Sequence, residues 1–367
     1  FNNQITDNII KITNCPICCV EADTAAYFQN KEFILQNSQR YFLINFYDNF
    51  YLDEYVKLGF DKNKIFTLNQ ATSIKMEDLE KLNNISFIGT NFCSLPPGYN
   101  FSNLDKNEFI KCLQEFNKNN YENYSNFESC CNNVTGNLLQ SYSMIDNRVH
   151  VLNAIWDLGL KLYGARWDKL SNENLILKFL FDETPKYTLK DNQDVYNSSV
   201  VNLSISHPQC KGFAFPWRCY DIMASSGILI SSYSENLKNK TKDYVKIPMF
   251  NSPQEARELC KYALANLNYV KDITSASNEF IEKEGRWINN FKVMEEKLNI
   301  KLLNNRPNEK GYDILMVPYE VINKTRKKSN LDMALKFLLS ELPVINVLYP
   351  KQKRKKIYER IGALQDD

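Results

Sequence analysis

Short apolar runs alternate with helical stretches along the first part of this chain, and this rhythm constrains the fold more than any other feature. NCPICCV at 14–20, YFLINF at 41–46 and ISFIGT at 85–90 are rich in strand-forming residues. Polar stretches with helical character lie between them, as at 26–38 and at MEDLEKL, 76–82. Strands that alternate with helices cross back over one sheet, so they run parallel. The rhythm predicts a layered α/β fold.

The rhythm is interrupted at 91–145, which is rich in Asn, Tyr and Phe. We expect an insertion there, either a small helical lid or a plain surface excursion. A helical period resumes over 147–160 and places four apolar residues on one face. These residues are Val149, Leu152, Ile155 and Trp156.

A compact helix–turn–strand unit follows further along the chain. WRCYDIMASS at 217–226 predicts a helix, and ILISS at 228–232 predicts a strand that follows with no room for a loop. The small residues at the end of the helix permit close packing against that strand. Two more strands are expected at 161–164 and 198–206. A further helix is expected at 252–266, with Ser252 as its N-cap before Pro253, and a polar helical region follows to about residue 299.

Composition excludes several classes of protein. The chain has 367 residues, 44% hydrophobic and 24% charged, with a net charge of +2, which is ordinary for a globular protein of one to three domains. No run is long and apolar enough for a membrane span, and none resembles a signal peptide. Ten Cys accompany only two His, and the single CxxC at 15–18 lacks a second one. Reduced, buried thiols in a cytoplasmic protein are therefore expected, rather than a zinc site.

The C-terminal part carries a second helix–turn–strand pattern, at 329–350, after an expected strand at 312–321. It is either a divergent copy of the unit at 217–232 or a chance similarity. KQKRKK at Lys351–Lys356 is a basic run. We expect a solvated tail there, with peripheral contact to an anionic membrane surface as the alternative. Nucleic acid is not an expected partner, because the aromatic residues fall in expected core strands.

Arg218 and Asp221 stand three residues apart at the start of the expected helix at 217–226. In parallel α/β folds, ligands bind where the carboxyl ends of strands enter helices. There Arg218 could contact a phosphate and Asp221 could hold the vicinal hydroxyls of a ribose. The alternative is an i,i+3 ion pair on the surface, worth a few tenths of a kcal/mol.

Five stretches in order carry a family likeness. They are Phe87-Ile-Gly89, Arg148, Leu162-Tyr-Gly-Ala-Arg-Trp167, the strand Tyr196-Asn-Ser-Ser-Val-Val-Asn-Leu203, and Arg218-Cys-Tyr-Asp-Ile-Met-Ala-Ser-Ser-Gly227. On these residues the chain resembles the group-1 glycosyltransferases, in particular their spore-maturation-type branch with the GT-B fold. The likeness covers about 85–290. The family has Ala-Cys-Gly where this chain has Ala-Ser-Ser-Gly, which implies one extra residue in the turn.

The resemblance implies a GT-B-like architecture, with two Rossmann-like domains facing a cleft and a helical insertion. Residues 1–84 would form the acceptor-side domain, which is about half the usual length, so the chain, beginning with Phe, is compatible with a fragment. Residues 85–290 would form the nucleotide-sugar domain, interrupted by the insertion at 91–145. Residues 291–367 would add an α/β segment and the basic tail.

The resemblance also implies roles for single residues. Arg218 would contact the phosphates as a catalytic group, and Asp221 would hold the ribose. Three pairs are further implied as donor-binding: Gly89 and Arg148 at the first strand–helix turn, Gly164 and Trp167 beside the base, and Ser198 and Asn202 near a strand end. An inverting enzyme would also need a base, for which Asp23 is the choice, with Glu21 and Asp48 as alternatives.

The implied activity is transfer of a sugar from a nucleotide-diphosphate donor to a glycan, a lipid-linked acceptor or a protein. No cofactor is expected beyond the donor substrate, and the GT-B fold requires no metal. The alternative is a catalytically inactive GT-B-like module that binds a nucleotide or a glycan. We expect a cytoplasmic protein, associated with a membrane if the basic run contacts one.

Overall fold

The computed structural model describes five stretches of the chain: 17–21, 31–46, 51–91, 148–207 and 213–299. A few positions within 171–187 are excepted, and Asn107, Ile110 and Cys210 are described as well. The chain divides into two compact units, Phe1–Leu303 and Asn304–Asp367. The expected insertion, the expected repeat at 312–350 and the basic run lie outside the described residues, apart from Asn107 and Ile110.

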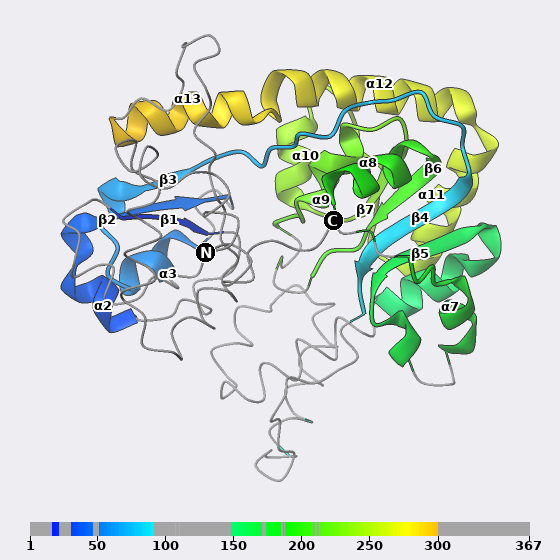
Figure 1. The fold of residues 1–367 in the computed structure, drawn as a ribbon, viewed down its shortest axis with the longest axis horizontal. Coiled ribbons are helices and arrows are strands. Elements are labelled where there is room, and N and C mark those ends of the chain that lie inside the picture. The colour runs from blue at the N-terminus through cyan, green and yellow to red at the C-terminus, as the bar shows by residue number, and fades with distance from the viewer. Residues whose placement is uncertain are drawn as a thin grey trace, which may run out of the picture. The chain divides into compact units, whose positions relative to one another are not determined.

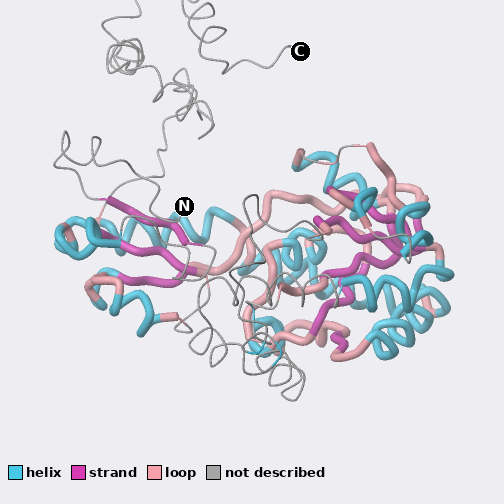
Figure 2. The backbone as a smooth tube through the Cα atoms, turned by 90° about the horizontal axis from the view of Figure 1, so that it is seen from below, coloured by secondary structure: helices cyan, strands magenta, loops and turns pink. Residues whose placement is uncertain are grey.

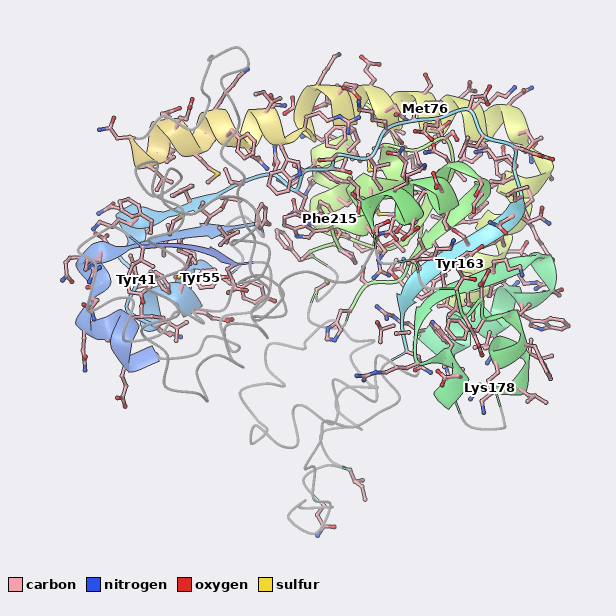
Figure 3. All side chains as sticks on the ribbon, viewed as in Figure 1. Tyr41, Tyr55, Met76, Tyr163, Lys178 and Phe215 are labelled. Atoms are coloured by element: carbon pink, nitrogen blue, oxygen red, sulfur yellow. The ribbon has the colours of Figure 1, made fainter. Side chains whose placement is uncertain are left out.

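A small parallel sheet is built from the first part of the chain (Figure 1). Its strands β1 (Ile17–Glu21), β2 (Tyr41–Asn45) and β3 (Ile65–Thr67) lie in the order β1-β2-β3. The helices α2 (Lys31–Gln36) and α3 (Leu52–Lys57) connect them. Buried aromatic and aliphatic side chains form its core, among them Ile34, Leu43, Tyr41 and Tyr55, the last two labelled in Figure 3.

A larger sheet follows, also with parallel strands throughout. It contains β4 (Asn83–Thr90), β5 (Leu160–Ala165), β6 (Ser199–Ser204), β7 (Ile228–Ser232) and β8 (Met249–Phe250). Their order in space is β5-β4-β6-β7-β8. The chain therefore places β5 on one side of β4 and then β6, β7 and β8 on the other side. This reversal makes the boundary between β4 and β6 the topological switch point of the sheet. The expectation of an α/β fold with parallel sheets is confirmed.

Helices accompany the strands of both sheets, and Figure 2 shows the alternation along the tube. In addition to a helix over 148–155, the helices of the larger sheet are α7 (Leu175–Leu180), α8 (Leu189–Asn197), α9 (Arg218–Met223), α10 (Glu235–Thr241), α11 (Pro253–Ala265) and α12 (Leu267–Glu284). The last described helix, α13 (Trp287–Leu298), contributes Met294 to a cluster with Ile44, Phe46 and Leu68 of the small sheet and its surroundings. Short 3-10 turns occur at η2 (Ser38–Arg40), η3 (Lys62–Lys64), η5 (Trp156–Leu158) and η6 (Trp167–Lys169).

Local sequence chemistry explains where several helices begin. The Ser252 hydroxyl accepts a hydrogen bond from the backbone N–H of Glu255, and Pro253 occupies the first turn of α11, as expected. Thr188 and Asp191 form a reciprocal capping box at the start of α8. These caps satisfy backbone N–H groups that would otherwise lack partners in the first turn.

One residue of the expected helical face at 147–160 is misplaced. Val149, Leu152 and Ile155 are buried in the core of the larger sheet, whereas Trp156 keeps 46% of its surface exposed. The helix ends at Ile155, and Trp156 begins the 3-10 turn η5. The change of helical period turns the indole away from the buried face.

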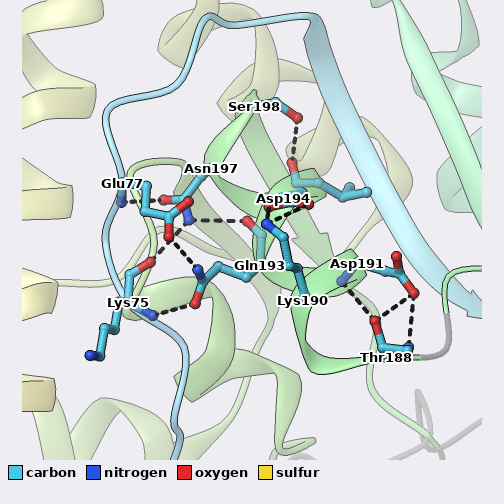
Figure 4. A network of polar contacts seen from close by, with 10 residues as sticks. Lys75, Glu77, Thr188, Lys190, Asp191, Gln193, Asp194, Asn197 and Ser198 are labelled. Atoms are coloured by element: carbon cyan, nitrogen blue, oxygen red, sulfur yellow. Dashed lines mark hydrogen bonds and ion pairs between the residues drawn. The ribbon is translucent and has the colours of Figure 1, made fainter.

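The expectation of a helix at 76–82 is wrong. Residues 68–82, which we call the strap, have neither helix nor strand structure and run extended to β4. Side chains of α8 bind the strap backbone: Asn197 Oδ1 accepts from the N–H of Glu77 at 3.0 Å, and Gln193 Oε1 accepts from that of Lys75 at 2.9 Å (Figure 4). Because these tertiary bonds satisfy the backbone, the strap does not need the helical hydrogen bonds that its composition favours.

Candidate functional site

The candidate site lies at the carboxyl end of β4, at the switch point of the larger sheet. Gly89 and Thr90 end β4, and the chain after β6 continues through Ser206 and His207. Open parallel sheets bind ligands outside the carboxyl ends of their strands at such a point. Arg148, at the start of the helix over 148–155, reaches this edge, because its Nη1 donates a hydrogen bond to the carbonyl oxygen of Thr90.

Two guanidinium groups meet on one aromatic ring there. Arg148 and Arg218 each place Cζ 5.5 Å from the ring centroid of Phe87. A Cβ atom on Gly89 would lie 2.8 Å from Cζ of Phe87 and 3.2 Å from Nη1 of Arg218, so a residue without a side chain leaves room for both the ring and the guanidinium. Nη1 of Arg218 is buried and, within the described residues, has no hydrogen-bond partner. The arrangement leaves a buried cationic donor that an anion could satisfy.

The two guanidinium groups and their burial affect the pKa values of Arg148 and His207. Burial, together with the charge of Arg218, holds the pKa of the Arg148 guanidinium well below its usual value. Burial and the charge of Arg148 lower the pKa of His207 to about 3, so its imidazole is neutral at pH 7. Positive charge is therefore concentrated at this edge of the sheet, and a bound anion would relieve the repulsion.

Asp221 lies one turn into α9 and does not pair with Arg218. Among the described residues no ion pair joins the two, and Oδ1 of Asp221 instead accepts a hydrogen bond of 2.5 Å from the hydroxyl of Thr72. Burial raises the pKa of the Asp221 carboxyl, while the Thr72 hydrogen bond and Arg218 act to lower it. The alternative of a simple surface ion pair is therefore wrong, and the two charges address different neighbours.

Gly164 and Trp167 support the site from behind. Gly164 has a φ of +115°, and a Cβ atom there would collide with the carbonyl group of Gly89 on the adjacent strand. Trp167 is fully buried, donates from Nε1 to the carbonyl oxygen of Gly89 at 2.8 Å, and packs edge-on against Phe87. The expectation that Trp167 borders a nucleotide base is corrected, since its ring has no exposed surface with which to contact one. It positions the end of β4 instead.

Ser198 and Asn202 are not brought to the carboxyl edge. Ser198 directly precedes β6, at the amino end of the strand, where its carbonyl oxygen accepts hydrogen bonds from Leu82 and Asn83. Asn202 is fully buried inside β6; its Nδ2 donates to the carbonyl oxygen of Tyr196 at 2.9 Å, and its Oδ1 accepts from the hydroxyl of Ser86. The expected donor contacts of both residues are corrected to structural roles.

The candidate bases are only partly placed. Glu21 is the last residue of β1 and is buried, in register with Asn45 at the end of β2. Asp23 and Asp48 lie outside the described residues, so the role of Asp23 remains a prediction.

Two residues of the site have no place in the sequence motifs. His207 follows β6 and could have drawn attention as one of only two His in the chain. Thr72 precedes Asp221 by 149 positions, in a segment expected to lead into a helix, and carries no sequence signal.

The described residues were also considered as ligands for a metal ion. In the part of the chain that the structure describes, no group of three or more His, Cys, Asp or Glu side chains could hold a metal ion. Burial raises the pKa of Cys219 to about 11 and that of Cys210 to about 12, so both stay protonated thiols at neutral pH. None of the described helices combines the length and apolar character that a membrane crossing requires.

No family model and no curated protein matches the chain. Among solved structures, the Anabaena protein HepE in complex with UDP and glucose is 10% identical, with 77% of this chain and 71% of that chain covered and a TM-score of 0.42. Sucrose-phosphate synthase from Thermosynechococcus elongatus is 12% identical, with coverages of 80% and 69% and a TM-score of 0.46. The pneumococcal O-GlcNAc transferase GtfA in complex with UDP and GlcNAc is 12% identical, with coverages of 79% and 59% and a TM-score of 0.42.

Proposed function

We propose that this chain is a glycosyltransferase that moves a sugar from a nucleotide-diphosphate donor to a glycan, a lipid-linked acceptor or a protein. The observation that carries the proposal is the pair of guanidinium groups on Phe87 at the switch point, where Nη1 of Arg218 is buried without a hydrogen-bond partner among the described residues. A diphosphate would supply negative charge and acceptor oxygens to these two guanidinium groups.

The chemistry of glycosyl transfer suits this arrangement. As the bond between sugar and diphosphate breaks, negative charge develops on the leaving phosphate oxygens. Arg218 would stabilise that charge as the catalytic group, with Arg148 behind it, because preorganised cations act strongly in a partly desolvated site. Since these fixed cations neutralise the leaving group, the proposal requires no metal and no cofactor besides the donor.

Asp221 would fix the nucleoside end of the donor. An ionised carboxylate accepts hydrogen bonds from both hydroxyls of a ribose, and the position of Asp221 one turn after Arg218 suits a ligand that spans phosphate and sugar. If the transfer inverts the sugar, Asp23 would serve as the base. A lipid-linked acceptor would bring the chain to a membrane surface, with Lys351–Lys356 as the contacting region.

A catalytically inactive module that binds a nucleotide or glycan is the second candidate. It is favoured by one observation: Trp167 and Asn202, both in motifs of the family likeness, serve the core and not the site. Hydrolysis of a sugar donor in the absence of acceptor would separate the two, because only an enzyme breaks the bond between sugar and diphosphate.

Thermal unfolding with UDP, GDP, CDP, ADP and CMP tests the donor site. We expect one diphosphate to stabilise the full chain by about 2.7 kcal/mol at a hundredfold excess over its Kd. Asp221→Ala should abolish this stabilisation. Asp272→Ala, which changes an exposed carboxylate on α12, should keep it.

Two results would contradict these expectations. A folded wild-type chain whose unfolding temperature responds to none of the five nucleotides would contradict the donor-site proposal. Stabilisation that persists in Asp221→Ala would remove that residue from the site.

A further inference from the structure

Thr72 makes the one side-chain hydrogen bond that Asp221 receives within the described residues. We propose that Thr72 is a positioning residue, which orients the Asp221 carboxylate toward the ribose of the donor. The inference rests on the proposed function and assigns a residue of the strap to a site built on the larger sheet.

The backbone of Thr72 is held in place from the junction of α12 and α13. Its N–H donates to the carbonyl oxygen of Gly285 at 2.9 Å, and its carbonyl oxygen accepts from Nη1 of Arg286 at 3.1 Å. The same guanidinium nitrogen also donates to the carbonyl oxygen of Ile74 at 2.6 Å. With only 2% of its surface exposed, Thr72 has little freedom to move.

The direction of the hydroxyl is set as well. The backbone N–H of Ile74 donates to Oγ1 of Thr72 at 3.0 Å, which occupies a lone pair of that oxygen. A hydroxyl has one proton, and here it is directed at Oδ1 of Asp221. Thr72 therefore acts as a donor aimed at the carboxylate from a rigid position.

Two consequences follow for Asp221. One oxygen of the carboxylate is fixed, so the plane of the group is set, and Oδ2 is left for the hydroxyls of a ligand. The bond also favours the ionised form, which opposes the effect of burial on the pKa of this carboxyl. Only the ionised form accepts hydrogen bonds with both oxygens and all lone pairs.

The experiment compares Thr72→Val, which removes the hydroxyl at nearly constant shape, with Thr72→Ser, which keeps it. Thr274→Val is the matched control, because Thr274 is a buried threonine of α12 whose hydroxyl bonds only to carbonyl oxygens of its own helix. Each full-length variant is titrated with the diphosphate that stabilises the wild type and with the 2′,3′-dideoxy form of the same nucleotide. The ratio of the two Kd values does not depend on how much of a variant is folded.

We expect Thr72→Val to weaken binding of the ribonucleotide about tenfold, the usual size of one hydrogen bond to a charged group. Binding of the dideoxy form should stay unchanged, and Thr72→Ser should restore the wild-type ratio. In Thr72→Val, the pH at which ribonucleotide binding is half-maximal should also rise, because the carboxyl loses the bond that lowers its pKa.

Other outcomes overturn the inference and distinguish it from the proposed function. A wild type that binds none of the nucleotides contradicts both. A wild type that binds, with a Thr72→Val variant whose Kd ratio and pH profile match those of Thr274→Val, contradicts only the role of Thr72. The same holds if Thr72→Val weakens both nucleotides equally, because that would indicate a structural effect alone.

Discussion

At the scale of single residues, the conformation at the end of β4 depends on two glycines that have no side chain. Gly89 leaves room for the guanidinium of Arg218, and Gly164 lets β5 approach the carbonyl group of Gly89. The same carbonyl receives the indole N–H of Trp167. The edge that carries the candidate site thus depends on two positions where a side chain cannot be accommodated.

Gly164→Ala tests this close approach. The variant would combine a positive φ with a backbone collision, so we expect it to lower the free energy of unfolding by about 3 kcal/mol or more. Gly159→Ala is the control: its φ is also positive, at +82°, but the nearest atom is the side chain of Asn84, which can move. Its cost should be about 1 kcal/mol.

Urea unfolding of both glycine variants provides the measurement. Equal losses of stability in Gly164→Ala and Gly159→Ala would contradict this expectation. They would show that the positive φ alone accounts for the loss and that a Cβ atom on Gly164 does not collide with Gly89.

At the scale of elements, the strap is held by side chains from two different helices. Asn197 at the end of α8 accepts from the N–H groups of Glu77 and Ser226 and donates to the carbonyl oxygens of Lys75 and Gln193. Arg286 holds the earlier part of the strap from the start of α13. Polar contacts thus add to the burial of Leu68 and Ile74 in ordering a segment without regular structure.

Asn197→Ala should release the strap locally. It leaves two backbone N–H groups without their acceptor, so we expect a loss of about 2–4 kcal/mol in the free energy of unfolding. Hydrogen exchange should quicken in peptides that cover Lys75 to Lys81, where Figure 4 shows the bonds that are lost.

The control for this element is Asn239→Ala, an exposed position whose Nδ2 donates a hydrogen bond to the carboxylate of Glu235 at 3.1 Å. It should leave both stability and exchange unchanged. Unaltered exchange of the strap in Asn197→Ala would mean that the strap is ordered by something other than α8.

At the scale of the whole molecule, His207 links stability to pH. The folded state keeps its pKa at about 3, whereas an unfolded chain has an imidazole with a pKa of about 6.5. Between these values the unfolded state binds a proton that the folded state does not. Stability should therefore fall as the pH drops below about 6.5, with a contribution from His207 of about 1.4 kcal/mol per pH unit.

Chemical denaturation at pH 7, 6, 5 and 4.5 checks this expectation. His207→Gln should show a shallower loss of stability with acidification than the wild type, and His150→Gln, which changes an exposed histidine, should show the wild-type slope. Parallel slopes in all three proteins would mean that His207 is accessible to protons in the folded state.

The agreement between sequence and structure was uneven for physical reasons. Strands at 41–46 and 228–232 and the capped start of α11 were predicted correctly, because apolar runs and capping residues act over a few positions. The segment at 76–82 was misassigned, because its helical composition was overridden by bonds from α8. Trp167 was expected beside the base and Ser198 among the donor-binding residues, but Trp167 is buried and Ser198 precedes β6. A motif gives the order of residues; it does not give the end of the strand that a residue occupies or the burial of its ring.

The α/β class, the parallel strands and the presence of Arg218 and Asp221 near the start of one helix could all be predicted from the amino-acid sequence. Each of these follows from periodicity and spacing over short stretches. Two contacts could be known only from the folded chain: Arg148 and Arg218 share the ring of Phe87, and Asp221 is hydrogen-bonded to Thr72 and not to Arg218. Those contacts join residues that lie 61 (148 − 87), 131 (218 − 87) and 149 (221 − 72) positions apart, and they depend on the strand order β5-β4-β6-β7-β8 and the path of the strap. Contacts of that separation depend on how the elements pack, which no local pattern encodes.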